Sequence, residues 1–536
     1  YQQVMGGSYG LFRTNTAYLS GSNNASLMVD YGHQTADGYR QHSRSLKDFI
    51  TLSGDFYINE NSTVSVFAGY SSTYDQLSGE TDSLGLFQSP KVPDPDYVAN
   101  NANVKMESTR FGLNHDYKFT EHFSNATSAF GGSAIIDQPF AAGVTKTNKM
   151  KFGARTVFTA TPEIGNVPLT VLFGAEFLKN FNYGENYSLT RDTLRGINSA
   201  LETQALQYNL LTQVDAKLTA TTILTIGASE NFMEYNVKDM LRFSREYTNS
   251  GYYLRFSPVL TPRIGINQLL GKNIAVYGNI SKGYSPPATN QFIIPQLNSV
   301  NTGLKPESAL SYEVGAKGNL LQERLNFELA LFAMTVEDKL VPQSFQANGS
   351  SPAYTITTNA GRVQHNGLET SLSYAFQPHQ SFITMIRPFV SYTYSDFTYR
   401  DYKSDNNNNS KTVDYSGKKE SGVAPNLFNA GFDAEALTGF YLNATVNYVD
   451  KMPLFPDDSH YAPCYSLLNA KLGFKKVMHT HYGIDMYVGS DNITNTTYPS
   501  MVFVNLVPRF PGQALEPFLP GEKRNWYGGI SFRYIF

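Results

Sequence analysis

The chain has 536 residues and a net charge of −3, and it is rich in aromatic residues (14%) but poor in charged ones (16%). The negative balance argues against nucleic acid as a partner, and the single cysteine, Cys464, excludes an intrachain disulfide framework and a multi-cysteine metal site. The mean hydropathy is −0.31, and no run of about 18 apolar residues could form a membrane-spanning helix.

Segments in which apolar and polar residues alternate recur along the whole chain, as in β-strands with two different faces. Strands are expected over residues 1–7, 9–20, 25–37, 45–58, 63–74, 105–118, 122–136, 148–161, 168–182, 204–219, 222–237, 252–266, 273–284, 309–320, 324–337, 354–376, 385–398, 423–435, 438–450, 463–476, 481–491 and 525–536. This makes about 22 strands, an even number, as in bacterial single-chain barrels. The sequence therefore predicts an all-β fold, a transmembrane antiparallel β-barrel, with residues 1–536 as one domain.

The connections between these strands alternate between short and long. Short turns are expected near residues 119–121, 165–166, 220–221, 321–323, 437–439 and 476–480. Long loops are expected over residues 76–104, 137–147, 183–203, 238–251, 285–308, 338–353, 399–422, 451–462 and 492–524. Short periplasmic turns on one rim and long extracellular loops on the other are typical of outer-membrane barrels.

The last strand, NWYGGISFRYIF, has one apolar face and one mixed face. The apolar face is formed by Trp526, Gly528, Ile530, Phe532, Tyr534 and Phe536. In water such a strand with a free edge would promote aggregation, whereas in a barrel this face lies on lipid. We therefore expect residues 525–536 to close the barrel against the first strand near Tyr1.

Several motifs, in order along nearly the whole chain, resemble those of TonB-dependent outer-membrane receptors. They are Gly7–Gly10, Asp37–Arg40, Lys282–Pro287 (KGYSPP), Asn301–Glu307 (NTGLKPE), Tyr312–Lys317, Asn366–Glu369, Asp491–Tyr498 and the C-terminal strand that ends in Phe536. The resemblance implies active uptake across the outer membrane of a Gram-negative bacterium, with energy supplied through TonB. It also implies that Ile530, Phe532, Tyr534 and Phe536 form the signal read by the barrel-assembly machinery.

Receptors of this family carry an N-terminal plug domain and a short box that binds TonB, and neither is present between Tyr1 and Phe536. A barrel of about 22 strands is too wide to be filled by its own side chains. We therefore expect a plug upstream of the first strand, together with the region that contacts the TonB complex. The other expected partners are outer-membrane lipid, lipopolysaccharide and the barrel-assembly machinery.

The resemblance further implies a ferric siderophore or a similar metal chelate as the transported ligand. Residues 285–306 contain no histidine, whereas haem importers of this family usually carry one there. Haem uptake is therefore disfavoured, while cobalamin, another chelate or a small peptide stay as alternatives. No resident cofactor or metal is expected, because the nine histidines show no metal-ligand spacing.

Candidate ligand residues lie on the predicted long loops, where aromatic and cationic side chains would meet an anionic iron complex. They are Tyr39, Arg40, His42, Tyr284, Asn290, Phe292, Tyr399, Arg400, His460, Tyr461, Arg509 and Phe510. For any one of them, a place in the interfacial aromatic girdle or a solvated loop charge is the commoner explanation. As a set they are favoured because loops carry function on such scaffolds.

Two other classes of function compete with a transport receptor. An outer-membrane enzyme needs a nucleophile with a base near the rim, and the sequence shows no such constellation, so a non-enzyme is expected. If the barrel has no plug, the alternative function is that of a diffusion channel or of a structural barrel within a larger surface complex.

Overall fold

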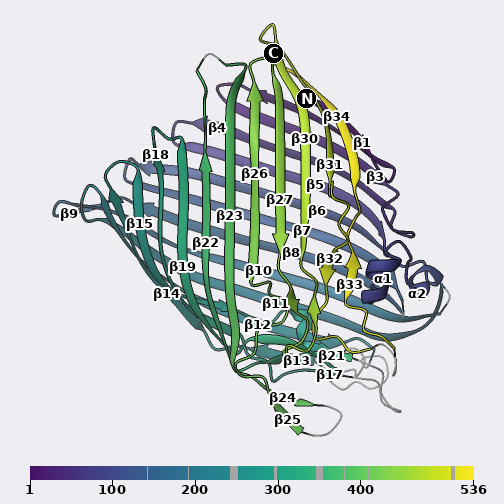
Figure 1. Cartoon of the computed structure of the whole chain (residues 1–536). Coiled ribbons are helices and arrows are strands. Elements are labelled where there is room, and N and C mark those ends of the chain that lie inside the picture. The colour runs from purple at the N-terminus through teal and green to yellow at the C-terminus, as the bar shows by residue number, and fades with distance from the viewer. Residues whose placement is uncertain are drawn as a thin grey trace.

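The computed structural model describes residues 1–141, 143–190, 192–241, 251–294, 299–345, 354–379, 381–406, 411–508 and 513–535. Its main sheet has 24 strands, of which β9 and β13 are short additions beside β10 and β12. The other 22 strands form a closed antiparallel barrel (Figure 1), which confirms the predicted fold class.

The wall strands are β1 (Gln2–Gly7), β2 (Leu11–Gly21), β3 (Ala25–Ala36), β4 (Ser45–Asn59), β5 (Ser62–Gln76), β6 (Asn103–Thr120), β7 (Phe123–Phe140), β8 (Gly143–Ala160), β10 (Val167–Thr190), β11 (Thr193–Lys217), β12 (Thr222–Asp239), β14 (Val259–Leu270), β15 (Ile274–Ser285), β18 (Glu307–Leu320), β19 (Leu325–Glu337), β22 (Arg362–Tyr374), β23 (Ile383–Asp401), β26 (Asn426–Ala436), β27 (Phe440–Val449), β30 (Tyr465–Met478), β31 (Tyr482–Asp491) and β34 (Asn525–Tyr534). The shorter elements are β9 (Glu163–Ile164), β13 (Gly251–Arg255), β16 (Ile293–Ile294), β17 (Ser299–Val300), β20 (Leu340–Phe345), β21 (Tyr354–Asn359), β24 (Lys403–Asn406), β25 (Lys411–Asp414), β28 (Met452–Pro453), β29 (Tyr461–Ala462), β32 (Pro499–Val502) and β33 (Phe518–Pro520), with helices α1 (Ser83–Gln88), α2 (Pro95–Ala99) and α3 (Thr289–Phe292).

The first and last strands close the barrel, as predicted. β1 pairs with β2 on one side and with β34 on the other, in a register that sets Gln2 opposite Phe532 and Gly7 opposite Tyr527. Both chain ends therefore lie on the same rim, at the top of Figure 1. We call this the short-turn rim, because the connections on it are short.

The outer face carries the apolar side chains. In β34, Trp526, Ile530, Phe532 and Tyr534 are between 40% and 55% exposed, as expected of side chains that face lipid; Phe536 lies outside the described residues. Strand β19 alternates in the same way, since Leu329 and Leu331 are exposed. Among the described residues, no helix is long and apolar enough to span a membrane.

The opposite rim, which we call the long-loop rim, differs from the prediction in three segments. Residues 137–147 and 183–203 are not loops, because β7 continues to Phe140 and β10 continues to Thr190 before the chain turns. The strands still pair there, but polar residues occupy both faces beyond the lipid, so the alternation that marks a strand is lost. The predicted strand over 354–376 is also two elements, since β21 pairs with β20 in a loop hairpin and the wall strand begins at Arg362.

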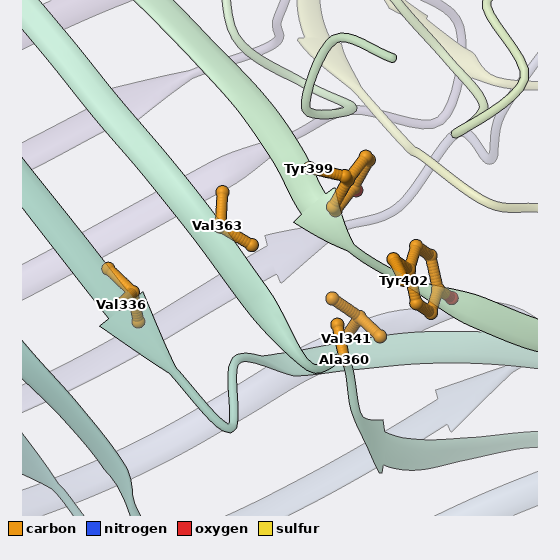
Figure 2. Close-up of a cluster of buried hydrophobic side chains, with 6 residues drawn as sticks. All are labelled: Val336, Val341, Ala360, Val363, Tyr399 and Tyr402. Carbon is orange, nitrogen blue, oxygen red and sulfur yellow. The ribbon is translucent and has the colours of Figure 1, made fainter. Parts of the chain in front are cut away.

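The buried apolar clusters of the molecule lie among the long loops. The cluster in Figure 2 joins the rim ends of β19, β22 and β23 to the β20–β21 hairpin and is formed by Val336, Val341, Ala360, Val363, Tyr399 and Tyr402. Nearby, His365 Nε2 lies 2.6 Å from Glu420 Oε2, and both side chains are buried. These contacts fix Tyr402 and Glu420 to the barrel wall.

Candidate ligand site on the inner wall of the barrel

The first predicted group of ligand residues holds a loop in place. Arg40 is 8% exposed and donates from its guanidinium to the carbonyl oxygens of Gly79 (2.5 Å) and Val92 (3.0 Å). Burial lowers the pKa of Arg40, although the carboxylates of Glu80 and Asp94 act in the opposite direction. These bonds tie residues 77–102 to the loop of residues 37–44.

The two neighbours of Arg40 in the predicted group take part in the same packing. Tyr39 is buried and packs edge-on against Tyr9, with ring centroids 5.4 Å apart. His42 Nε2 lies 2.9 Å from the carbonyl oxygen of Ala102. Buried or engaged in this way, these side chains leave little surface for a ligand.

The other predicted residues are scattered over the rim. Phe292 and Tyr399 are completely or almost completely buried, and Tyr284 is half-buried. Arg400 follows the buried Tyr399 in β23 and is exposed, at a β-bulge where the pairing with β22 shifts register. Tyr461 is 41% exposed, with Lys451 Nζ 5.1 Å from its ring centroid, and His460 packs edge-on against Phe455. The side chain of Asn290, and all of Arg509 and Phe510, lie outside the described residues.

A cavity of about 680 Å³ lies against the wall formed by β6, β7, β8, β10, β11 and β12. Phe111 and Met150 are more than half exposed on the outer face, so Arg110, Lys149 and Lys151, at alternate positions, point into the barrel. The strand registers place Arg110, Gly132, Lys151, Asn180, Ala205 and Tyr235 in one row across these strands. Residues distant in sequence thus meet on one surface.

This inner surface is cationic. In the part of the chain that the structure describes, its lining includes Arg110, Lys149 and Lys151 together with the amides of Asn180 and Asn182, and no aspartate or glutamate. Among the described residues, none of the three cations is in an ion pair. Unpaired guanidinium and ammonium groups in a concave surface attract anions and can hydrogen-bond carboxylate or phenolate oxygens.

The segment from Pro286 to Thr289 covers the cavity on one side. The hydroxyl of Tyr235 donates a hydrogen bond to the carbonyl oxygen of Pro287, and the ring of Phe292 packs edge-on at 4.9 Å from that of Tyr235. On the opposite side, a Cβ at Gly132 would lie 2.4 Å from the carbonyl oxygen of Thr109. Glycine therefore keeps the wall between Arg110 and Lys151 free of side chains.

Sequence reasoning did not find these three cations. Each lies on the polar face of a strand that alternates like the other strands of the wall, and no local pattern marks it as special. The three cations stand out only because they lie close together across neighbouring strands, and this closeness depends on the pairing register of those strands. Among the described residues, no cluster of three or more histidine, cysteine, aspartate or glutamate side chains could hold a metal ion.

Comparison with known proteins supports a receptor fold. The chain is 21% identical to Fiu, a catecholate siderophore receptor of Escherichia coli strain K12, over 506 residues that cover 83% of this chain and 60% of that receptor. It is similar in structure to the siderophore receptor PiuA of Acinetobacter baumannii, with a TM-score of 0.80, 14% identity, and 99% of this chain and 81% of that one covered. The ferric citrate transporter FecA in its unliganded form gives a TM-score of 0.80 at 13% identity, covering 99% of this chain and 78% of that one.

The chain thus spans about 60% of the length of Fiu of strain K12. A family model described as "TonB dependent receptor-like, beta-barrel" matches residues 3–493. With the closed 22-stranded wall, this match shows that the chain belongs to the family of TonB-dependent receptor barrels of the Gram-negative outer membrane.

Proposed function

We propose that this protein is the barrel of an active-transport receptor that binds a ferric siderophore, or a similar anionic metal chelate, and imports it with energy supplied through TonB. Iron is then the cargo, and the protein needs no resident cofactor and catalyses no reaction. The observation that carries the proposal is the cationic inner surface of Arg110, Lys149 and Lys151. The printed names of the relatives, a catecholate siderophore receptor and a ferric citrate transporter, support it.

The charge on such chelates fits this surface. A ferric ion bound by three doubly deprotonated catechols is a trianion, and ferric citrates are also anionic. One unit charge about 6 Å from another contributes roughly 0.7 kcal/mol in bulk water and roughly 3 kcal/mol at the effective dielectric constant near a protein surface. Three cations without carboxylate neighbours would therefore raise both the affinity for an anionic chelate and its rate of capture.

The proposed partners follow from the same function. A plug domain and a segment that contacts the TonB complex would complete the receptor. The exposed apolar outer face is in contact with lipid, and lipopolysaccharide is the proposed neighbour of the outer leaflet. The barrel-assembly machinery is proposed to read Ile530, Phe532, Tyr534 and Phe536 at the end of the chain.

The test is uptake of radioactive iron by a strain that lacks the gene and carries it on a plasmid. The variant Arg110→Gln/Lys149→Gln/Lys151→Gln should lower uptake of an anionic ferric chelate at least tenfold, with normal amounts of folded barrel in the outer membrane. Lys47→Gln is the matched control, because Lys47 belongs to another strand and lies 3.9 Å from Asp75. If uptake does not depend on the gene for any chelate tried, the proposed function is refuted. If the triple variant takes up the chelate as well as the unmodified protein does, the proposed site is refuted.

A further inference from the structure

One lysine on the outer wall of the barrel lies among phenylalanine rings. Lys179 belongs to β10, where Phe177 is exposed on the lipid face and Asn180 lines the inner cavity, so the side chain of Lys179 points outward. Strand pairing sets Lys179 opposite Phe152 of β8, which is 41% exposed. The Nζ atom of Lys179 lies 5.3 Å from the ring centroid of Phe181. A positive charge is therefore placed on the face of the barrel that meets the membrane.

Within the described chain, no carboxylate neutralises this charge. Lys179 is in no ion pair there, and the outward-facing Glu234 and Glu202 have other partners. Glu234 lies in the same row two strands away, and its Oε1 is 3.4 Å from Arg255 Nε. Glu202 Oε1 on β11 is 3.5 Å from Lys238 Nζ. A lysine on the lipid face costs little only near the surface of the bilayer, so Lys179 marks the level of the lipid head groups, where its charge is available to an anion.

Beyond this level, toward the long-loop rim, the same face of β10 carries two phenols and a carboxylate. The hydroxyls of Tyr183 and Tyr187 donate to Oε1 and Oε2 of Glu185, at 2.7 Å and 2.8 Å. Lys146 of β8 lies opposite Glu185, with its Nζ 6.0 Å from the ring centroid of Tyr187. We call Tyr183, Glu185 and Tyr187 the tyrosine–glutamate strip, which begins about 13 Å along the strand from Lys179. Its rings can cover the apolar face of a sugar, and its carboxylate can accept hydrogen bonds from sugar hydroxyls.

We propose that the outer wall of β8 and β10 binds a phosphorylated glycolipid of the outer leaflet. An acyl chain would lie against Phe177, a phosphate would accept a hydrogen bond from Lys179 Nζ, and the sugars would follow the tyrosine–glutamate strip. The apolar, cationic and sugar-binding side chains occur along the strand in the order in which these parts occur in such a lipid. This surface is on the opposite side of the wall from the cavity, so nothing that fills the lumen covers it.

The inference goes beyond the proposed function, because lipid binding here depends neither on a chelate nor on TonB. It gives the proposed neighbour in the outer leaflet, lipopolysaccharide, a defined site on the wall. A lipid held at this site would stay with the receptor when the membrane is dissolved, whereas lipids that only fill the surrounding leaflet would exchange with detergent.

Native mass spectrometry of the full-length receptor in a neutral detergent tests the phosphate contact. The receptor is titrated with diphosphorylated lipid A, and the fraction of lipid-bound protein gives the affinity. Lys179→Met should lower this affinity about fivefold, the effect of one lysine near an anionic membrane surface. Lys179→Arg should preserve it, because the positive charge is kept. Dephosphorylated lipid A should bind the unmodified receptor about fivefold more weakly and should not respond to Lys179→Met.

A second titration and a matched control separate the parts of the site. With a glycolipid that carries inner-core sugars on lipid A, Glu185→Gln should lower the affinity about fivefold, while binding of lipid A alone stays unchanged. Lys47→Met is the control, because Ile50 is 46% exposed on the lipid face of β4 and Lys47, at an odd position of that strand, points inward. Heat-modifiable gel mobility reports the folding of each variant. If Lys179→Met does not fold, the comparison of phosphorylated with dephosphorylated lipid on the unmodified receptor still tests the phosphate contact.

Equal affinities of Lys179→Met and Lys47→Met for diphosphorylated lipid A would overturn the inference, as would equal binding of the phosphorylated and dephosphorylated lipids. Phosphatidylglycerol that displaces lipid A at equal concentration would overturn the assignment to a glycolipid. These outcomes are separate from failure of the proposed function, which is judged by iron uptake in cells. A receptor that imports no chelate could still bind the glycolipid, and a siderophore importer could lack this site.

Discussion

The contact between Gly489 and Tyr527 gives a quantitative prediction about the closing strands. Gly489 is buried in β31 and lies opposite Tyr527 of β34. A methyl group at position 489 would lie 2.4 Å from Cζ and 2.5 Å from the hydroxyl oxygen of Tyr527. Carbon atoms in contact are normally about 3.5–4.0 Å apart, so the ring must move by about 1 Å or more.

This displacement should destabilise the barrel. Overpacking typically costs about 1–3 kcal/mol, and loss of the edge-to-face contact with Tyr487 would add about 0.5–1.5 kcal/mol. We therefore expect Gly489→Ala to lower the free energy of unfolding by about 2–4 kcal/mol. Gly283→Ala is the matched control, because Gly283 also lies in a strand and a Cβ there would have no atom within 4 Å.

Urea unfolding of the barrel in lipid vesicles, followed by heat-modifiable gel mobility, measures the difference. The double variant Gly489→Ala/Tyr527→Ala should be no less stable than Tyr527→Ala alone, because the clash is then absent. Equal stability of Gly489→Ala and Gly283→Ala would refute the reasoning.

Four further predictions concern the closing strand and the long loops. Phe532→Arg on the lipid face should lower the free energy of unfolding in urea by about 2–4 kcal/mol near the bilayer midplane. Ser531→Ala on the inner face should leave this free energy nearly unchanged. Deletion of residues 534–536 should abolish assembled barrel while synthesis continues; normal heat-modifiable barrel would contradict this. Arg40→Met should leave the buried carbonyl oxygens that Arg40 binds without donors, which should lower the free energy of unfolding by about 1–3 kcal/mol. It should also increase proteolysis within residues 77–102. Burial, with the nearby phenols, raises the pKa of Tyr402 from 10.0 to about 12. Since the unfolded chain then loses this proton first, the free energy of unfolding should fall as the pH rises from about 10 to 12, and ultraviolet titration of Tyr402→Phe should show one phenol fewer ionising near pH 12.

The barrel itself could be predicted because lipid imposes a simple rule on each strand. One face must be apolar, so alternation such as that of Ile530, Phe532 and Tyr534 appears directly in the sequence. The rule ends where the strands leave the bilayer. For this reason the long-loop ends of β7, β8, β10 and β11 are predicted as loops, although their hydrogen-bonded pairing continues.

The candidate site was less predictable than the fold. Tyr399 and Phe292 resemble exposed rim aromatics in the sequence but are buried among loops packed on one another. A loop's own sequence does not show which neighbouring loop will cover it. The distinction between a ligand contact and a packing residue therefore required the folded structure.

The sequence alone determined the strand number, the closing pair of β1 and β34 and the alternation of short and long connections, because each follows from local periodicity and turn composition. The tertiary structure decided which side chains share a surface. Arg110 and Lys151 form one cationic row on the inner face, and Lys179 lies opposite Phe152 on the outer face, through the pairing registers of the strands that carry them. A shift of one residue in any of these registers would turn those side chains to the opposite face, and no local pattern in the sequence specifies that alignment.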